Sequence, residues 1–181
     1  MSEAPCIAIP ETLFACAESS SFSGVYDCEK IAAGPDDYRF KQPLSWEVAV
    51  TNTGDALLLR GSIKGVALTH CARCLDEFSV DICGEIEGYF LLSDNENTPQ
   101  DMNEDEFDVL ADNKIIALKP LLDAAILLEL ALIPLCSEDC RGLCSQCGQD
   151  LNEADCACMQ NDNDFEKEKN PFSVLKNFSF E

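Results

Sequence analysis

Apolar and polar residues alternate along three stretches in the middle of the chain, at residues 44–51, 57–69 and 78–92. A period of two is the pattern of a β-strand that buries one face and exposes the other. Short connections between successive strands favour antiparallel pairing of neighbours. The alternation therefore predicts an antiparallel meander, which could also close into a barrel.

The first 43 residues are patterned more weakly, so the alternation does not decide the topology of this part. Short strands are predicted near residues 6–9 and 25–31. The serine-rich residues 19–24 are typical of a loop, and the sequence Gly-Pro-Asp-Asp at residues 34–37 is typical of a turn.

One helix is predicted at residues 121–133, where the chain is apolar except for two acidic residues. A helix that is apolar on most sides is expected to be buried on most sides. Pro120 suits the first helical turn because the backbone N–H that it lacks would have no partner there, and Pro134 ends the helix. A short extended segment is predicted just before the helix, at residues 115–118.

Two polar, acidic segments are predicted to lie outside the core. The first is a mobile loop near residues 93–112, interpreted as a solvated insertion or, alternatively, as a handle for a basic partner. The second is the tail of residues 159–181, in which apolar residues recur at helical spacing over residues 170–178. A short terminal helix is predicted there, packed on its own domain or docked on a partner.

Composition allows one hydrophobic core and argues against nucleic acid as a direct ligand. The chain has 181 residues, of which 46% are hydrophobic, and its 34 acidic and 12 basic side chains give a formal charge of −22. Binding to a nucleic-acid backbone requires lysines and arginines that displace counterions. A basic protein partner matches this charge better than RNA does.

No secretory signal or membrane span is predicted. The N-terminus has neither a basic region nor an apolar run, and no apolar stretch reaches the roughly 18 residues that a membrane span needs. The chain has 12 cysteines. In a reducing compartment, clustered cysteines indicate metal binding more often than disulfides. We therefore expect a cytoplasmic protein.

Six of the cysteines fall within residues 136–158, separated by small, polar or acidic residues that no hydrophobic core requires. This density indicates a metal knuckle. Cys144 and Cys147 come first as ligands, because their spacing lets two thiolates face one ion and the following Gly148 can adopt the positive φ of a tight turn. Four ligands for one ion would come from Cys136, Cys140, Cys144, Cys147, Cys156 and Cys158.

Cys136 and Cys140 rank next because they share the same compact loop, whereas Cys156 and Cys158 lie close enough to replace either of them. A tetrahedral site made only of sulfur is typical of structural Zn²⁺, with iron as the less favoured alternative. The remaining interpretation is a set of free or disulfide-bonded thiols.

A further pair, Cys71 and Cys74, lies between the second and third predicted strands. The simplest interpretation is that both thiols stay reduced and shape the turn. They could also combine with two of the six C-terminal cysteines in a second four-thiolate site. A redox pair usually has a cysteine at a helix N-terminus, which lowers its pKa, and no helix is predicted to begin at Cys71.

These elements predict an α+β protein in three parts. Residues 1–135 form a domain with the antiparallel sheet and the buried helix, residues 136–158 form a cysteine-rich zinc knuckle, and residues 159–181 form the acidic tail with its short helix.

Four motifs stand in a distinctive order along the chain. They are Cys71-x-Arg73-Cys74-Leu75, then Pro134-Leu135-Cys136 after the apolar helix, then Asp139-Cys140-Arg141-Gly142-Leu143-Cys144-x-x-Cys147-Gly148-x-Asp150-Leu151-Asn152, and finally Asn170-Pro171-Phe172-x-Val174-Leu175. From about residue 44 to the C-terminus, the chain resembles the YceD family of bacterial and plastid proteins, called large ribosomal RNA subunit accumulation proteins.

The resemblance implies a cytoplasmic protein without established enzymatic activity that is needed for the accumulation of large-subunit (23S) ribosomal RNA or its precursors. It also implies that the C-terminal cysteines stabilise the domain rather than carry the shared activity, because some members keep the first Cys-x-Arg-Cys pair and lack them. The hypothesis is a non-enzymatic ribosome-biogenesis factor that binds a basic ribosomal protein or assembly factor. The alternatives are a rubredoxin-like iron electron carrier and a thiol-redox protein that uses Cys-x-x-Cys pairs.

Overall fold

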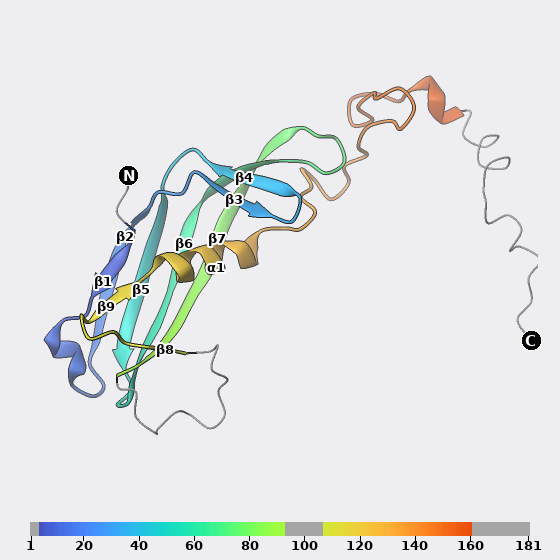
Figure 1. Ribbon diagram of the computed structural model, residues 1–181. Coiled ribbons are helices and arrows are strands. Elements are labelled where there is room, and N and C mark those ends of the chain that lie inside the picture. The colour runs from blue at the N-terminus through green and yellow to red at the C-terminus, as the bar shows by residue number, and fades with distance from the viewer. Residues whose placement is uncertain (1–3, 93–106, 161–181) are drawn as a thin grey trace, which may run out of the picture. The chain divides into compact units, whose positions relative to one another are not determined.

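The computed structural model describes residues 4–92 and 107–160, which divide into two compact units (Figure 1). The sheet unit consists of Met1–His70 and Glu77–Pro134, and the cysteine unit consists of Cys71–Asp76 and Leu135–Glu181. The sequence predicted a knuckle of residues 136–158 alone. In the structure, Cys71–Asp76, the short segment between two long strands of the sheet unit, belongs to the cysteine unit as well.

The sheet unit has nine strands in its described part. They are β1 (Cys6–Ala8), β2 (Ser19–Tyr26), β3 (Lys30–Ala33), β4 (Asp36–Phe40), β5 (Leu44–Asn52), β6 (Ala56–His70), β7 (Glu77–Leu91), β8 (Asp108–Val109) and β9 (Ile115–Ala117). Seven strands form the main sheet, in which β5 pairs with β2 and β6, β6 also pairs with β4 and β7, and β4 pairs with β3. All these pairs are antiparallel, whereas β8 pairs with the end of β7 in parallel; β1 and β9 form a separate two-stranded sheet.

The three strands predicted from alternation are confirmed as β5, β6 and β7, and they pair in that order. In β5 the buried side chains include Trp46, Val48 and Val50, whereas Ser45 and Glu47 are exposed, as a period of two requires. The sheet does not close into a barrel, because the pairings of the described residues leave β2 and β7 unpaired with each other. The barrel alternative is therefore wrong.

The prediction of a loop at the serine-rich residues 19–24 is wrong. These residues form most of β2, which pairs with β5 along its full length. Its serines offer little hydrophobic signal, and the ladder supplied by β5 determines its conformation. Gly24 lies within the strand rather than in a turn, and its lack of a side chain lets the Trp46 ring pack closely against it. A Cβ there would lie 2.6 Å from Cζ2 of Trp46. The turn predicted at residues 34–37 is confirmed at Gly34, which has a φ of +63° and separates β3 from β4.

The predicted helix is present as α1 (Lys119–Glu129), which begins with a proline in its first turn as expected. It packs on β6 and β7 (Figure 1). The prediction that this helix is buried on most sides is wrong. Leu122 and Ile126 are buried, but Leu128 is 84% exposed. The helix has only one layer to pack against, so its other face meets solvent. The helix ends before residue 133 because Leu130 turns to an extended conformation and buries its side chain.

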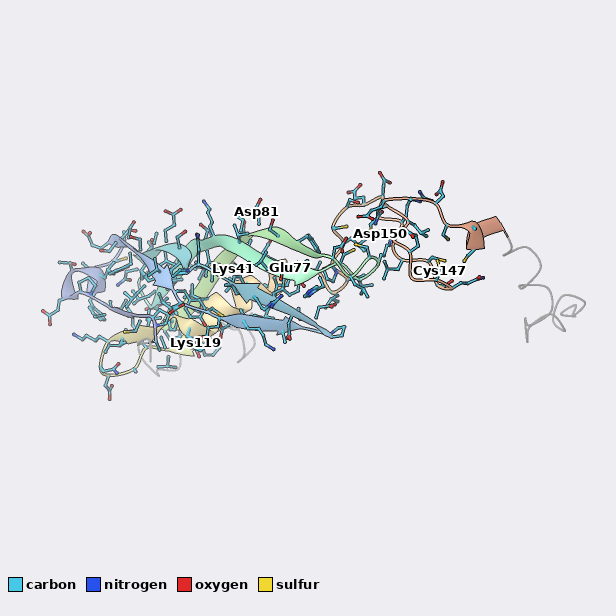
Figure 2. The ribbon with its side chains drawn as sticks, turned by 90° about the horizontal axis from the view of Figure 1, so that it is seen from above. Lys41, Glu77, Asp81, Lys119, Cys147 and Asp150 are labelled. Atoms are coloured by element: carbon cyan, nitrogen blue, oxygen red, sulfur yellow. The ribbon has the colours of Figure 1, made fainter. Side chains whose placement is uncertain are left out.

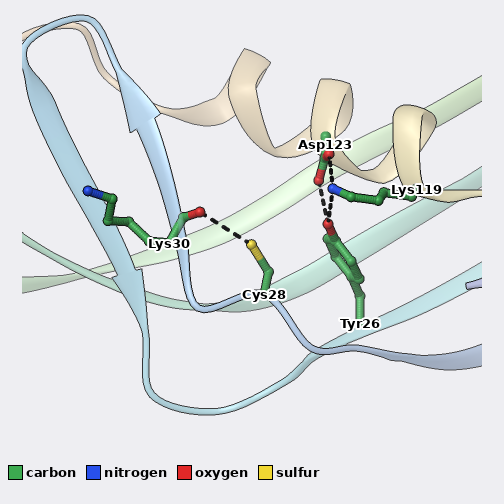
Figure 3. A network of polar contacts seen from close by, with 5 residues as sticks. All are labelled: Tyr26, Cys28, Lys30, Lys119 and Asp123. Carbon is green, nitrogen blue, oxygen red and sulfur yellow. Dashed lines mark hydrogen bonds and ion pairs between the residues drawn. The ribbon is translucent and has the colours of Figure 1, made fainter. Parts of the chain in front are cut away.

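A polar network ties α1 to β2 (Figure 3). The Tyr26 hydroxyl donates to Asp123 Oδ1 at 2.6 Å, and Lys119 Nζ donates to the Tyr26 hydroxyl at 3.0 Å and to Asp123 Oδ2 at 2.6 Å. Burial, followed by the hydrogen bond to Asp123, raises the pKa of Tyr26 to about 12. The three side chains satisfy one another, so this network fastens the helix to the sheet.

Two predicted features fall outside the described residues, namely the terminal helix at residues 170–178 and most of the acidic loop, residues 93–106. The last part of that predicted loop, around β8, is a short strand. In the described ranges, no helix is long and apolar enough to cross a membrane.

Candidate metal centres

Eight cysteines of the cysteine unit gather in two groups of four. The first cluster is Cys71, Cys74, Cys136 and Cys140, and the second cluster is Cys144, Cys147, Cys156 and Cys158. Within each cluster, all four Sγ atoms lie within 4.8 Å of one another. Figure 2 labels Cys147 of the second cluster and Asp150 on the same loop. The two clusters could therefore each bind a metal ion.

The first cluster takes two ligands from the turn between β6 and β7. In this turn, the Leu75 backbone N–H donates to the Cys71 carbonyl and the Cys71 N–H donates to the Asp76 carbonyl, both at 2.9 Å. Leu75 has a φ of +67°, so the chain reverses tightly after Cys74. The reversal leaves the sulfur atoms of Cys71 and Cys74 on the same side as those of the C-terminal segment.

Sulfur–sulfur distances in the first cluster match a tetrahedral metal site. The Sγ atoms of Cys71 and Cys140 are 3.7 Å apart, as are those of Cys74 and Cys136. A disulfide would bring two sulfur atoms to about 2.05 Å. Bonds of about 2.3 Å from a central zinc ion give tetrahedral edges of about 3.8 Å. These four thiols therefore fit a metal ion and are too far apart to be bonded to one another.

The charge balance of the first cluster also calls for a cation. Burial opposes the Cys71 thiolate, but backbone N–H groups of Cys74, Cys136 and Arg73 outweigh it and lower the pKa of Cys71 to about 6. The Asp76 N–H favours a Cys74 thiolate, whereas burial and the three neighbouring cysteines raise the pKa of Cys74. Four thiolates cannot be charged together without a counter-charge, which a bound dication would supply.

Arg73 joins the two segments that carry the first cluster. Its Nη1 donates to the Cys140 carbonyl at 2.8 Å and to the Glu138 carbonyl at 3.3 Å, and its own carbonyl accepts from the Leu143 N–H at 3.1 Å. The approach requires Gly142, which has a φ of +73° and where a Cβ would lie 2.9 Å from the Arg73 carbonyl oxygen. The motif residues Arg73 and Gly142 therefore position the cysteines.

The second cluster lies within one segment, residues 144–158, which is a loop that ends in a short 3-10 helix, η3 (Ala157–Gln160). The Gly148 N–H donates to the Cys144 carbonyl at 2.9 Å, and Gly148 has the positive φ, +73°, that the sequence predicted for this turn. Backbone N–H groups of Cys147 and Gln146 lower the pKa of Cys144 to about 7. The neighbouring Cys147 and then burial raise the pKa of Cys158 to about 12. As in the first cluster, one thiolate is favoured locally and the full set needs a cation.

The structure groups the predicted ligands differently from the ranking made on the sequence. Cys136 and Cys140 lie with Cys71 and Cys74 rather than with Cys144 and Cys147, so the alternative of two four-thiolate sites describes the arrangement. Cys156 and Cys158 both belong to the second cluster. Four cysteines, Cys6, Cys16, Cys28 and Cys83, lie outside the two clusters.

Outside the cysteine clusters, the surface of the described residues has open hollows. One hollow of about 550 Å³ lies on the outer face of the sheet over β2, β5 and β6, and its charged side chains are Glu47 and Arg60. The Tyr26 network is outside it, and none of the cysteines lines it. The two cysteine clusters are therefore the sites that carry distinctive chemistry in the described part of the chain.

The sequence matches a family model and several curated proteins. The family model described as large ribosomal RNA subunit accumulation protein YceD matches residues 59–179. Uncharacterized proteins of Mycobacterium bovis and Mycobacterium tuberculosis are each 32% identical over 108 residues, which is 60% of this chain and 51% of theirs. An uncharacterized protein of Mycobacterium leprae is 26% identical over 109 residues, or 60% of this chain and 49% of its own.

The chain thus spans about half the length of the curated relatives that it matches. No solved structure matches the chain. The family match covers more than half of the chain and includes every cysteine of both clusters. The chain belongs to the YceD family of large ribosomal RNA subunit accumulation proteins.

Proposed function

We propose that this protein is a non-enzymatic ribosome-biogenesis factor that supports the accumulation or processing of large-subunit (23S) ribosomal RNA through a basic protein partner. Family membership carries the proposal. The effect on RNA would then be indirect, through a ribosomal protein or an assembly factor in the cytoplasm.

Charge supports a basic partner. The chain carries a formal charge of −22. On β7, an exposed row along one face contains Glu77, Asp81, Glu85 and Glu87, the first two of which are labelled in Figure 2. Exposed charges are screened beyond a Debye length of about 8 Å at physiological salt. Binding to the partner should therefore weaken as salt rises, and a tight complex that is insensitive to salt would contradict this mechanism.

We also propose that each cysteine cluster holds one structural Zn²⁺. A site closed by four protein thiolates leaves no open position for substrate, and bound zinc would supply folding energy rather than redox chemistry. The two ligand sets, Cys71, Cys74, Cys136 and Cys140 and then Cys144, Cys147, Cys156 and Cys158, satisfy this requirement.

The rubredoxin-like alternative rests on the same observation, because four thiolates at tetrahedral spacing also fit iron. Colour separates the two metals, since a ferric thiolate site absorbs visible light and a zinc site does not. The thiol-redox alternative requires a thiol that reaches its substrate. Cys71 is 0% exposed and Cys74 is 3% exposed, so that alternative is disfavoured.

The decisive experiment depletes the protein in its own cell and quantifies large-subunit against small-subunit ribosomal RNA, with precursors resolved. A selective fall in the large-subunit species is expected. Complementation with a Cys83→Ser chain, which changes an exposed cysteine outside both clusters, should restore the ratio. An unchanged ratio after depletion would show that the family role does not extend to this chain.

A further inference from the structure

Asn152 connects the two cysteine clusters. It lies between Cys147 and Cys156, in the loop of the second cluster, yet its Nδ2 donates to Cys140 Sγ of the first cluster at 3.4 Å. The same Nδ2 donates to Asp150 Oδ1 at 2.9 Å. A hydrogen bond of this kind withdraws charge from a metal-bound thiolate and fixes its orientation.

The rest of the Asn152 amide is also engaged. Its Oδ1 accepts from the Arg141 backbone N–H at 2.7 Å, and its own backbone N–H donates to Asp150 Oδ1 at 2.8 Å. Both Nδ2 hydrogens and the carbonyl oxygen therefore have partners, so the side chain has one favoured orientation. That orientation points the amide at the sulfur of Cys140.

The position of Asn152 depends on two supports. One is a short ladder, in which the Leu151 N–H donates to the Gly142 carbonyl at 2.9 Å and the Cys144 N–H donates to the Gln149 carbonyl at 2.8 Å. The other is the second cluster, which would close the loop between Cys147 and Cys156 when it holds a metal. Without metal there, Asn152 keeps the ladder and its hydrogen bonds to Arg141 and Asp150 but loses the closure of its loop.

We propose that Asn152 couples the two sites, so that metal bound in the second cluster strengthens metal binding in the first. The inference rests on the proposed occupancy of both clusters by Zn²⁺. Coupling between two binding equilibria is reciprocal, so metal in the first cluster strengthens binding in the second by the same factor. Loss of an outer partner of a metal ligand typically lowers metal affinity about 10- to 100-fold, which sets the scale of the coupling.

The exposure of the cysteines indicates which cluster should lose its metal first. In the first cluster, Cys71, Cys74 and Cys140 are each no more than 3% exposed and Cys136 is exposed. In the second cluster, Cys147 is exposed and the other three cysteines are partly exposed. A chelator in solution should reach the second cluster first, because all four of its cysteines are at least partly exposed. The first cluster then loses part of the support of Asn152, so the supply of metal at the second cluster controls how firmly the first cluster holds its own metal.

The test uses the full chain loaded with Zn²⁺ and challenged with excess EDTA. At intervals, free thiols are alkylated with N-ethylmaleimide and the modified cysteines are identified by mass spectrometry. Cys71, Cys74 and Cys140 report on the first cluster, and Cys156 and Cys158 report on the second. Bound zinc per chain is measured in parallel by elemental analysis.

Three variants form a double-mutant cycle, namely Cys147→Ser, which removes a second-cluster ligand, Asn152→Ala, and the two together. Each single change should speed alkylation of the first cluster roughly tenfold. The double variant should be no faster than either single variant, because both remove the same contact. Glu153→Ala, an exposed neighbour in the same loop, is the matched control and should behave as the unaltered chain.

A spectroscopic signature separates the hydrogen bond from a general loosening of the loop. In the chain loaded with two Co²⁺ ions, Asn152→Ala should shift a sulfur-to-cobalt charge-transfer band to longer wavelength, because the thiolate loses an N–H donor. Glu153→Ala should not. A change in alkylation rate without this shift would overturn the role given to the amide.

Failure of the coupling and failure of the metal proposal give different results. The coupling alone is overturned if the unaltered chain binds two zinc ions and Cys147→Ser leaves the alkylation rate of the first cluster unchanged. It is also overturned if the effects of Cys147→Ser and Asn152→Ala on that rate multiply in the double variant. A chain that binds no metal overturns the occupancy proposed above and the coupling with it.

Discussion

The sheet unit and the cysteine unit hold their folds by different means. The main hydrophobic core contains Trp46, Ile63 and Ile126 and lies entirely in the sheet unit. Among the described residues of the cysteine unit, the buried apolar side chains are three cysteines and Leu151. A segment with so little apolar burial cannot offset the entropy of ordering its backbone. The comparison indicates that burial stabilises the sheet unit and that the cysteine unit needs another source of stability, which the proposed metal ions would supply.

Metal removal should separate the two units most clearly. A structural zinc site contributes about 10 kcal/mol or more of apparent binding energy at neutral pH, which is folding energy where the site is absent from the unfolded chain. Treatment with a strong chelator should therefore unfold residues 71–76 and 135–158 and leave β5, β6 and β7 folded. Amide hydrogen exchange resolved by peptide measures this, and loss of protection in both units together would break the comparison.

A core substitution should have the converse effect. Ile63 is fully buried in the middle of β6, and its replacement by alanine leaves a cavity in the sheet unit. The expected loss is about 2–5 kcal/mol in the free energy of unfolding of that unit, with two metal ions still bound per chain. Urea unfolding and elemental analysis measure the two quantities. Val66→Ala, at a position on the same strand that is 51% exposed, is the control and should change little.

The two units also differ in how much of them could be predicted from the sequence. Alternation identified β5, β6 and β7 because each strand buries one face against a single layer. The same information failed for Ser19–Tyr26, whose serines carry no hydrophobic pattern and whose conformation depends on pairing with β5. It also placed the end of α1 too late, because nothing local marks the turn at Leu130.

In the cysteine unit, spacing identified the ligand pairs but not their grouping. Cys144 and Cys147 are three positions apart and share a turn, so sequence is enough to bring them together. Cys74 and Cys136 are 62 positions apart, and their sulfur atoms approach only because the turn between β6 and β7 belongs to the cysteine unit. Local spacing carries no information about such a long-range contact. The available signal was the Cys-x-Arg-Cys motif, whose arginine bonds to the Cys140 carbonyl.

Alkaline pH should act on the sheet unit through Tyr26. Its pKa is raised to about 12 in the folded state, so the neutral hydroxyl stabilises the fold fully below the ordinary tyrosine pKa of about 10. As pH rises from about 10 to 12, the unfolded chain loses this proton first, and roughly 2–3 kcal/mol of stability is lost. Urea unfolding at pH 9 and pH 11 measures the slope. Tyr26→Phe should flatten it, and an equal slope in that variant would assign the effect to other groups.

Surface charge should matter least to the stability of either unit. Arg60 Nε lies 3.5 Å from Glu87 Oε1 on the outer face of the sheet, with both side chains about two-thirds exposed. Solvent screens such a pair, so its contribution is about 0–1 kcal/mol. Arg60→Ala should leave the free energy of unfolding nearly unchanged while raising the net negative charge from −22 to −23. If burial and metal dominate as argued, that variant should unfold at the same urea concentration as the parent. A shift as large as that of Ile63→Ala would contradict this ranking. It would mean that the cations of so acidic a chain stabilise the sheet about as much as burial does, because each lost cation increases the repulsion among the acidic side chains.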